Sequence, residues 1–519
     1  MQLLLSLAPA FLAITPTFAA SPEEWRGKSI YQLVTDRFAV ANDSAPLCDT
    51  AARKHCGGSW KGITNHLDYI QNMGFDAVWI SPIYKNLDVV TKRGEAYHGY
   101  WVKDFNALNP HFGTEDDLKE LVKALHDRGM YIMLDMVVNH CTAPALPPAF
   151  DFDGYFHPFT DASYFRPPTC WTNGSMELDI MQNCWLGDPI LPLPDLNTDQ
   201  PRVVDLLYQN VHDIVTKYGI DGVRVDTVKH IRSDFWPGWV KGAGVYALGE
   251  LYSNDTDFIA PWTQVIDGVT DYPSYFYLRQ AFSKAGGPIQ PFIDEMSSQL
   301  LKNAMTYLFI HDGLPIVYYG QEQDYNGAID PSNREALWFS AYQKEKPMVK
   351  YIKTLNGARK AAIAAPKNFL TTPLKFLAVE NTSFAVSKPP MLALLTNAGN
   401  QSHNVTWSVP DAGFAPNETL VDVLSCEKVE ADGHGGVNVR AIGGMPQMLM
   451  PALIAIQGRA LCPDAAKTIW QASKYKKAPK HSNEQLQTSM ASDRDRNLVS
   501  WMILFASLAF VTTFRLRLM

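Results

Sequence analysis

Two carboxylic acids and an arginine stand at the ends of two apolar runs near the middle of the chain. Arg224 and Asp226 close the run GVRVD (222–226), and Glu250 closes VYALGE (245–250). Cleavage of a glycosidic bond with retention needs a carboxylate nucleophile and a carboxylic acid about 5–5.5 Å apart. Residues two apart point to the same side of a strand, so Arg224 would hold Asp226 ionised. An apolar setting would keep Glu250 protonated until it donates its proton.

A third apolar run also carries polar residues towards its end. YIMLDMVVNH (131–140) contains Asp135 and ends in Asn139 and His140. In a parallel barrel, the reacting groups project from the C-terminal ends of the strands. A single acid at a strand end is usually an ion pair or a helix cap, but three consecutive polar strand ends in register indicate a site.

Apolar runs that alternate with amphipathic helical segments must position these residues. This alternation extends from Trp25 to about residue 340 and is the pattern of βα units. One helical segment begins at a Thr-x-x-Asp cap at Thr114, and another has Pro201 near its start and Gly219 after its end. The expected strands lie within residues 29–38, 77–82, 131–140, 222–226, 245–250, 265–273 and 315–320. The pattern predicts an α/β fold of the (β/α)₈ TIM-barrel class.

The spacing of the segments predicts further domains. Residues 141–200 form a connection too long for a simple barrel loop, and we expect them to be a small domain inserted after the third strand. The barrel would then comprise 21–140 and 201–365. Short strands with turn residues predict a C-terminal antiparallel β-sandwich domain over 366–465, in which FLAVEN, SFAVSK, LALLTN, HNVTWSV and QMLMPALIAI are strands.

Both ends of the chain indicate passage through the secretory pathway. Residues 1–20 are apolar, end in small residues and are typical of a signal peptide. A polar stalk (466–497) precedes an apolar run in 498–519, which predicts a glycolipid (GPI) anchor signal or, alternatively, a single membrane span. Sequons for N-glycosylation occur at Asn42, Asn173, Asn254, Asn381, Asn400, Asn404 and Asn417. A net charge of −8 argues against nucleic acid as a partner.

The seven cysteines form two close pairs, one wide pair and a remainder. An oxidising compartment makes three disulfides plausible, although spacing alone does not define their connectivity. The pairs by spacing are Cys48–Cys56, Cys170–Cys184 and Cys426–Cys462. Cys141 is left over, either as a reactive thiol or as a buried inert one.

Six ordered stretches resemble the signature regions of the α-amylase family. They are AVWISP (77–82), DMVVNH (135–140), LPDLNT (193–198), GVRVDTVKH (222–230), LGE (248–250) and GQEQDYNG (320–327). AYHGYW (96–101) and the three cysteine pairs are also in place, and the similarity extends from about Trp25 to Cys462. The chain is most similar to fungal secreted α-amylases and to their surface-anchored relatives that act as glucanotransferases.

The resemblance implies a role for each matching residue. Asp226 matches the nucleophile, Glu250 the acid/base, Arg224 the arginine that orients the nucleophile, and Asp135 a nearby acid of the substrate site. The other implied substrate-binding residues are His98, Tyr100, Trp101 and His140 at the cleavage subsite, with Lys229 and His230 on the leaving-group side.

A calcium site is implied as well. Asn139, Asp195 and the main-chain carbonyl of His230 match the family's Ca²⁺ ligands, which are the oxygen donors that a hard cation prefers. Gln182 stands where the fungal pattern has a glutamate, and the loss of that charge should weaken binding. No second histidine is spaced to join His230, which argues against zinc.

One part of the family pattern is missing. The family has a third carboxylate, in a His-Asp motif at the end of the seventh strand. Here about forty residues separate Pro273 from Pro315, whereas two further βα units would need more. We therefore expect the region of the seventh strand to be deleted, through a gene prediction that skipped an exon or in a true product. His311 and Asp312 are rejected as substitutes because they precede GLPIVYYG.

Two functions of different classes follow. The first is a retaining α-amylase-type glycosidase that hydrolyses or transfers α-1,4-glucan at the cell surface, as a monomer, with low turnover because the third carboxylate is missing. The second is a non-catalytic surface protein that binds carbohydrate on an amylase-like barrel. The retention of Asp226, Glu250 and Arg224 favours the enzyme.

Overall fold

The computed structural model describes residues 20–282, 298–325, 327, 329–399, 406–457 and 461–463. The expected signal peptide (apart from Ala20), the stalk and the anchor segment lie outside the described residues. No helix within the described ranges is both long and apolar enough to cross a membrane.

A parallel sheet forms the centre of the catalytic part. Its strand order is β10-β9-β8-β5-β2-β1-β11, and all of its pairings are parallel. The strands are β1 (Ile30–Leu33), β2 (Ala77–Ile80), β5 (Tyr131–Met136), β8 (Gly222–Val225), β9 (Tyr246–Gly249), β10 (Gly268–Val269) and β11 (Ile316–Tyr318). Each lies inside one of the apolar runs that predicted it, so the predicted barrel class is confirmed. Strands β2, β8 and β9 are buried along their whole length, as expected of strands covered on both faces.

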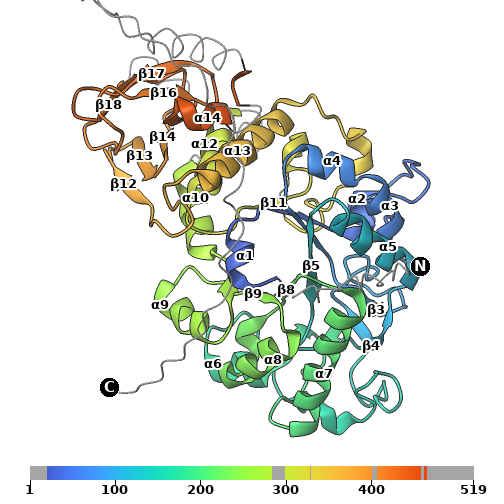
Figure 1. Ribbon diagram of the computed structural model, residues 1–519. Helices are drawn as coiled ribbons and strands as arrows, with labels where there is room; N and C mark the ends of the chain where they lie inside the picture. Colours follow the sequence, from blue (N-terminus) through green and yellow to red (C-terminus); the bar gives the residue numbers. More distant parts are fainter. Residues whose placement is uncertain are drawn as a thin grey trace, which may run out of the picture. The chain divides into compact units, whose positions relative to one another are not determined.

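Helices cover the outside of this sheet. Figure 1 shows α5 (Glu115–His126), α7 (Pro201–Tyr218) and α8 (Trp236–Ala243) outside β5, β8 and β9. The capping box at Thr114 is present. The Thr114 hydroxyl accepts a hydrogen bond from the Asp117 amide, and the Asp117 carboxylate accepts one from the Thr114 amide. Other helices of the barrel part are α1 (Pro22–Arg26), α2 (Thr35–Phe38), α3 (Trp60–Asn65), α4 (Leu67–Asn72), α9 (Thr256–Ile259), α10 (Tyr272–Phe282), α12 (Ser298–Ile310) and α13 (Pro347–Ala364).

The sheet order has two ends, β10 and β11. Between them the chain passes through α10 and α12, and the described residues add no strand that joins β10 to β11. This is the position at which the sequence analysis expects the seventh strand to be deleted. Residues 283–297 lie outside the description.

Two antiparallel hairpins stand near the C-terminal ends of the barrel strands. One, β3 (Tyr84–Asn86) with β4 (Val102–Leu108), flanks AYHGYW and was not predicted from the sequence. The other, β6 (Leu186–Asp188) with β7 (Leu191–Leu193), follows α6 (Leu178–Asn183) within the long connection. A cluster of aromatic rings packs this connection, including Phe150, Phe152, Phe156, Phe165 and Trp185.

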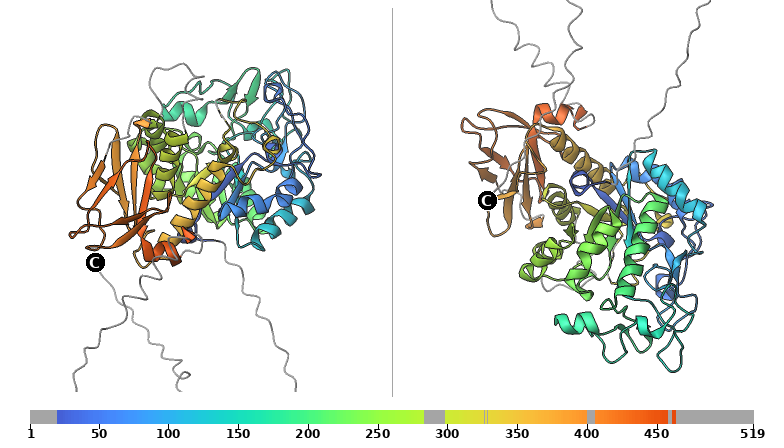
Figure 2. Two further views of the ribbon diagram at one scale, coloured as in Figure 1. Left: turned by 90° about the horizontal axis from the view of Figure 1, so that it is seen from above. Right: turned by 60° about the horizontal axis from the view of Figure 1, so that its bottom comes forward.

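The C-terminal strands form antiparallel sheets, coloured orange to red in Figure 2. One sheet has the order β12-β13-β14-β19-β16-β17, and β15 pairs with β18. The strands are β12 (Lys375–Leu377), β13 (Ser383–Lys388), β14 (Met391–Thr396), β15 (Thr406–Val409), β16 (Thr419–Asp422), β17 (Lys428–Glu430), β18 (Val437–Arg440) and β19 (Gln447–Pro451). The expected strand QMLMPALIAI is only half a strand, because α14 (Ala452–Gln457) follows. Ala452 and Ala455 are both buried, and this spacing of three suits a helix.

All three cysteine pairs inferred from spacing are disulfides in the structure: Cys48–Cys56, Cys170–Cys184 and Cys426–Cys462. Cys141 is free and buried. Burial raises the pKa of its thiol well above the usual range, which disfavours the reactive thiolate. Cys141 is therefore the inert thiol of the two alternatives.

Candidate active site

A pocket of about 830 Å³ opens at the C-terminal ends of the parallel strands. Its wall includes side chains that end or follow β2, β8 and β9, together with residues from the AYHGYW loop and from the segment after β11. The lining residues that carry the argument are Tyr100, Trp101, His140, Arg224, Asp226 and Glu250. The predicted acid pair, Asp226 and Glu250, therefore meets in one cavity.

Arg224 is the centre of the polar network. Its Nη1 lies 2.7 Å from Asp135 Oδ1 and 2.9 Å from Asp226 Oδ1, and its Nη2 lies 2.7 Å from Glu250 Oε2. The side chain is almost fully buried, with the guanidinium 5.4 Å from the centre of the Trp79 ring. One planar cation thus fixes three carboxyl groups at the ends of β5, β8 and β9.

Asp135 lies beneath the pocket rather than in its wall. It is fully buried, and its Oδ2 accepts hydrogen bonds from the Tyr100 hydroxyl at 2.7 Å and from the Trp79 indole at 3.0 Å. Burial raises the pKa of Asp135, while Arg224 and these two donors oppose the rise. Asp135 therefore anchors both Arg224 and Tyr100.

Burial, Arg224 and the two acids themselves shift the pKa values of Asp226 and Glu250. Burial raises the pKa of Asp226 well above its usual range, and the charge of Glu250 adds to the rise, although Arg224 opposes it. Burial acts on Glu250 in the same direction, but Arg224, the Thr227 amide and the Tyr272 hydroxyl together lower its pKa. Glu250 has three such donors, whereas the Arg224 guanidinium is the donor at Asp226. The two acids therefore titrate as a pair, because the charge of each opposes ionisation of the other.

Thr227 has a strained backbone beside both acids. Its φ is 53° and ψ is 39°, in the left-handed region that a β-branched residue rarely adopts. In this conformation its amide donates to Glu250 Oε2 at 3.2 Å. Its Oγ1 is buried and has no hydrogen-bond partner. The turn after Asp226 thus supports Glu250 at the expense of stability.

Replacing Thr227 with glycine should raise the free energy of unfolding by about 1 kcal/mol, because glycine adopts this conformation without strain and leaves no buried hydroxyl. Urea denaturation of the two proteins measures the change. Thr227→Ala is the matched control, since it keeps a Cβ in the left-handed region. A glycine variant less stable than the alanine variant would contradict this account.

The predicted sugar-binding residues divide into two groups. Tyr100, Trp101 and His140 line the pocket. Burial lowers the pKa of His140 to about 4, so the ring is neutral near pH 7 and can exchange hydrogen bonds with hydroxyl groups. His98 packs behind this wall, where its Nδ1 accepts the Tyr100 amide at 3.0 Å and its ring meets Trp101 edge to face. The structure thus places His98 as a support for Tyr100.

The two residues expected on the leaving-group side do not line the pocket. Lys229 donates to the Tyr252 carbonyl at 3.0 Å, and the His230 Nδ1 lies 3.1 Å from the Met181 carbonyl. Both side chains therefore tie neighbouring segments together. Aromatic rings that the sequence analysis did not single out occupy this part of the wall, namely Tyr252, Tyr272 and Tyr275. The tyrosine-rich segment after Asp271 was the sequence signal for Tyr272 and Tyr275.

The residues expected to bind calcium lie on adjoining segments. Asn139 and Asp195 are brought together because the Leu196 amide donates to the Asn139 carbonyl at 2.9 Å. The Asn139 Oδ1 and Asp195 Oδ1 are buried without a hydrogen-bond partner, while Arg166 Nε lies 3.1 Å from the other Asp195 oxygen. The hydrogen bond between His230 and the carbonyl of Met181 places Met181, the residue before Gln182, in the same region.

Two unpartnered oxygens fit a hard cation. The described part of the chain contains no group of three or more His, Cys, Asp or Glu side chains that could hold a metal. The predicted calcium set has one carboxylate, Asp195, and otherwise depends on amide and main-chain oxygens. It is therefore a weakly charged site.

His311 and Asp312 do not line the pocket. Asp312 accepts the Leu374 amide at 3.1 Å and pairs with Lys388 of the C-terminal domain, and both residues precede the N-terminal end of β11. Among the described residues that line the pocket, Asp271 is the one carboxylate besides Asp226 and Glu250. It is exposed and caps α10 through the Ser274 amide at 3.1 Å.

The parallel barrel sheet carries an Arg-linked acid pair at its C-terminal edge, and comparison with known proteins identifies the family as one of carbohydrate-active enzymes. The family model for the α-amylase catalytic domain matches residues 32–293, and that for α-amylase domain C matches 376–469. Alpha-amylase mde5 of Schizosaccharomyces pombe is 36% identical over 86% of this chain and 91% of its own length. The α-amylase of Saccharomycopsis fibuligera is 37% identical over 83% and 93%.

A solved structure agrees. The α-amylase from Malbranchea cinnamomea superposes with a TM-score of 0.80 at 38% identity and covers 85% of this chain and 100% of its own. The chain belongs to the α-amylase family of glycoside hydrolases.

Proposed function

We propose that this protein processes α-1,4-linked glucan with retention through a covalent glucosyl–Asp226 intermediate. The observation that carries the proposal is the shared guanidinium, because Arg224 contacts both Asp226 and Glu250 at hydrogen-bonding distance. An α-amylase of Geobacillus thermoleovorans, 27% identical with a TM-score of 0.67, was solved in complex with acarbose. This relative supports an α-glucan-like ligand.

The first step requires Glu250 to be ionisable but protonated and Asp226 to be ionised. Arg224, whose Nη1 lies 2.9 Å from Asp226 Oδ1, stabilises the ionised Asp226. Glu250 gives its proton to the glycosidic oxygen as the bond from that oxygen to C1 breaks, and an Asp226 oxygen forms the new bond to C1. Glu250, now ionised, takes the proton of a water or sugar hydroxyl that attacks C1 and releases Asp226. Water gives hydrolysis, and a sugar hydroxyl gives transfer.

A mechanism-based glucosyl label tests the proposal. We expect a fluorinated α-glucosyl donor to add one sugar mass to the peptide that contains Asp226, as detected by mass spectrometry. A protein that binds maltooligosaccharides but is never labelled would instead be the non-catalytic surface binder. A label on any other residue would overturn the assignment of the nucleophile.

We expect turnover of soluble starch to be about 10³-fold below that of a complete fungal α-amylase. The third family carboxylate has no counterpart in the described pocket wall apart from the exposed Asp271. Contacts to sugar hydroxyls that strengthen in the transition state are worth several kcal/mol. Side-by-side reducing-sugar assays at equal protein concentration measure the difference. Rates within tenfold of each other would refute it.

We also propose that Asn139, Asp195, Gln182 and the His230 carbonyl hold Ca²⁺, which would join the barrel to the long connection. A chelator should lower the melting temperature, and calcium at about 100 times its Kd should restore roughly 3 kcal/mol of stability. The Asp195→Ala variant is the control, since its melting temperature should no longer respond to calcium. Indifference of the wild-type protein to calcium would exclude the site.

We further propose a secreted, monomeric protein tethered to the cell surface by a GPI anchor. The three disulfides support an oxidising compartment. Release from cells by a phosphatidylinositol-specific phospholipase would support the glycolipid, whereas retention would indicate a membrane span.

A further inference from the structure

Arg334 contributes a guanidinium to the pocket wall from a segment without regular structure. It lines the same cavity as Tyr100 and Asp226, and its Nε is buried without a hydrogen-bond partner. Residues 329–336 form turns rather than a helix or strand. The position of Arg334 must therefore be fixed by contacts outside its own segment. One is a hydrogen bond from the Tyr318 hydroxyl to the Asn333 carbonyl at 3.2 Å.

Another anchor is Asp330, which is contacted by side chains from two distant loops. Arg53 Nη1 lies 2.9 Å from Asp330 Oδ2, and Arg53 Nη2 donates to the Asp330 carbonyl at 3.4 Å. The Tyr97 hydroxyl reaches Asp330 Oδ1 at 3.4 Å. Arg334 Nε lies 3.7 Å from the same oxygen. Asp330 thus links Arg53 and Tyr97 to the pocket residue Arg334.

Arg53 is held in a conformation that aims it at Asp330. Its φ of 50° is in the left-handed region, and its carbonyl accepts the Glu95 amide at 2.8 Å. A Cβ at Gly94 would lie 2.5 Å from the Arg53 Cβ, so the two loops approach each other as closely as glycine allows. The Cys48–Cys56 disulfide closes the loop that carries Arg53.

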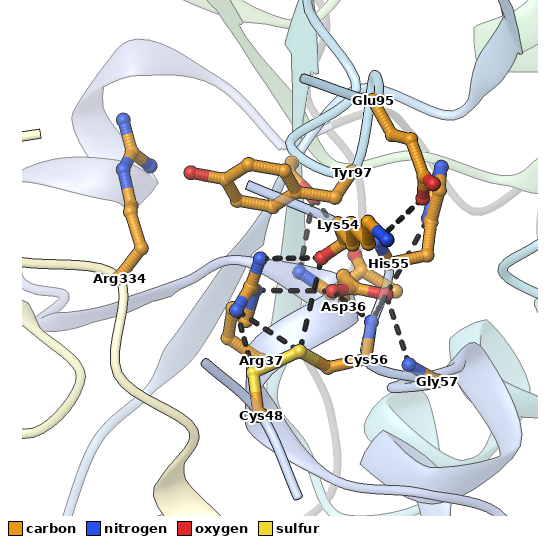
Figure 3. Close-up of polar contacts among 12 residues, drawn as sticks. Asp36, Arg37, Cys48, Lys54, His55, Cys56, Gly57, Glu95, Tyr97 and Arg334 are labelled. Atoms are coloured by element: carbon orange, nitrogen blue, oxygen red, sulfur yellow. Dashed lines mark hydrogen bonds and ion pairs between the residues drawn. A yellow bond between two sulfur atoms is a disulfide. The ribbon is translucent and has the colours of Figure 1, made fainter. Parts of the chain in front are cut away.

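Arg37 contacts both the loop that carries Arg53 and the loop that carries Tyr97 (Figure 3). Its Nη1 donates to the sulfur atoms of Cys48 and Cys56 at 2.6 and 3.1 Å, and its Nη2 donates to the Lys54 carbonyl at 2.7 Å. Its guanidinium also lies 4.0 Å from the centre of the Tyr97 ring. Arg37 is fully buried and is paired with Asp36 at 3.0 Å. The same buried cation therefore supports the disulfide loop and Tyr97, the two elements that reach Asp330.

We propose that the Cys48–Cys56 loop is a clamp that positions Arg334 for glucan binding, with Arg53 as its positioning residue. The proposal rests on the proposed function only for the identity of the ligand. Without Arg53, Asp330 loses contacts to both its carboxylate and its carbonyl, and residues 329–336 can shift. The Arg224 network makes no contact with Arg53, so the loss falls on binding rather than on the chemical step.

The test compares the binding of maltoheptaose by calorimetry and its turnover in wild-type and Arg53→Gln proteins. We expect the Kd and KM of the variant to rise about fivefold, the size expected for a partly exposed ion pair, with kcat within twofold of wild type. Arg53→Lys should recover part of the affinity. Arg128→Gln is the matched control, because Arg128 forms a 2.9 Å ion pair with Asp68, and neither residue lines the pocket.

A double-mutant cycle with Arg334→Gln distinguishes positioning from a general effect on stability. If Arg53 acts through Arg334, the double variant should bind no more weakly than Arg334→Gln alone. Additive losses, or an Arg53→Gln variant with wild-type affinity, would overturn the clamp. A wild-type protein that neither binds nor converts maltoheptaose would instead refute the proposed function.

Discussion

Replacing Asp226 with asparagine is expected to lower the turnover of α-glucan about 10⁴-fold while leaving the fold intact. Asparagine has the same shape but cannot form the bond to C1 that the proposed mechanism requires. Its amide oxygen can still accept the hydrogen bond from Arg224, so the substitution should not disrupt the site. Initial rates on maltoheptaose and urea denaturation measure the two quantities.

Glu250→Gln is the companion variant that separates the two roles. Its activity should also fall, but on a glucosyl substrate with a good leaving group, added azide should restore release of the sugar, because azide needs no general base. In the Asp226→Asn variant, azide should not produce a glucosyl azide that retains the anomeric configuration of the substrate. An Asp226→Asn protein that kept more than about a tenth of wild-type turnover would remove the nucleophile from the mechanism.

Replacing Arg224 with methionine should destabilise the protein by about 3–5 kcal/mol. Arg224 is 6% exposed and is the one cation within hydrogen-bonding distance of Asp135, Asp226 and Glu250 among the described residues. Methionine fills a similar volume, so the loss measures the unpaired carboxyl groups rather than a cavity. The free energy of unfolding in urea at pH 7 is the measurement.

The pH dependence identifies the cause of this loss. Without Arg224, burial would raise the pKa values of these carboxyl groups above those of the unfolded chain. The folded variant would then bind more protons than the unfolded one, so its stability should recover as the pH falls from 7 to 5 and decline again as it rises. A deficit relative to wild type that is the same at both pH values would point to packing instead.

The elements of the barrel could be predicted because each carries a local signal. The buried strands read as apolar runs, and α5 and α7 have caps at Thr114 and Pro201. The meeting of Asp226 and Glu250 also followed from sequence, since parallel strands end at one edge. The features that the sequence analysis did not predict depend on contacts between residues that are distant in sequence. The hairpin of β3 and β4 has no strong alternation, and Lys229 is turned away by the Tyr252 carbonyl.

The pKa shifts of the two acids could not be predicted from the sequence for the same reason. The expectation for Asp226 used only its neighbour Arg224, whereas the structure shows that Arg224 also pairs with Glu250 and that Thr227 and Tyr272 donate to Glu250. A pKa depends on the sum of such contributions. Arg53 and Arg37 read as ordinary surface charges in the sequence, because their partners Asp330 and Tyr97 are remote along the chain.

The sealed Cys141 has a consequence for how this molecule tolerates heat. Thiol–disulfide exchange begins with attack by a thiolate, and Cys141 is both inaccessible and held protonated while the native structure persists. Once the chain unfolds, the same thiol returns to an ordinary acidity of about 8.5 and can attack any of the three bridges. Scrambled pairings would then prevent return to the native state. We therefore expect survival at high temperature to follow the rate at which Cys141 is first uncovered, rather than an equilibrium between folded and unfolded chains.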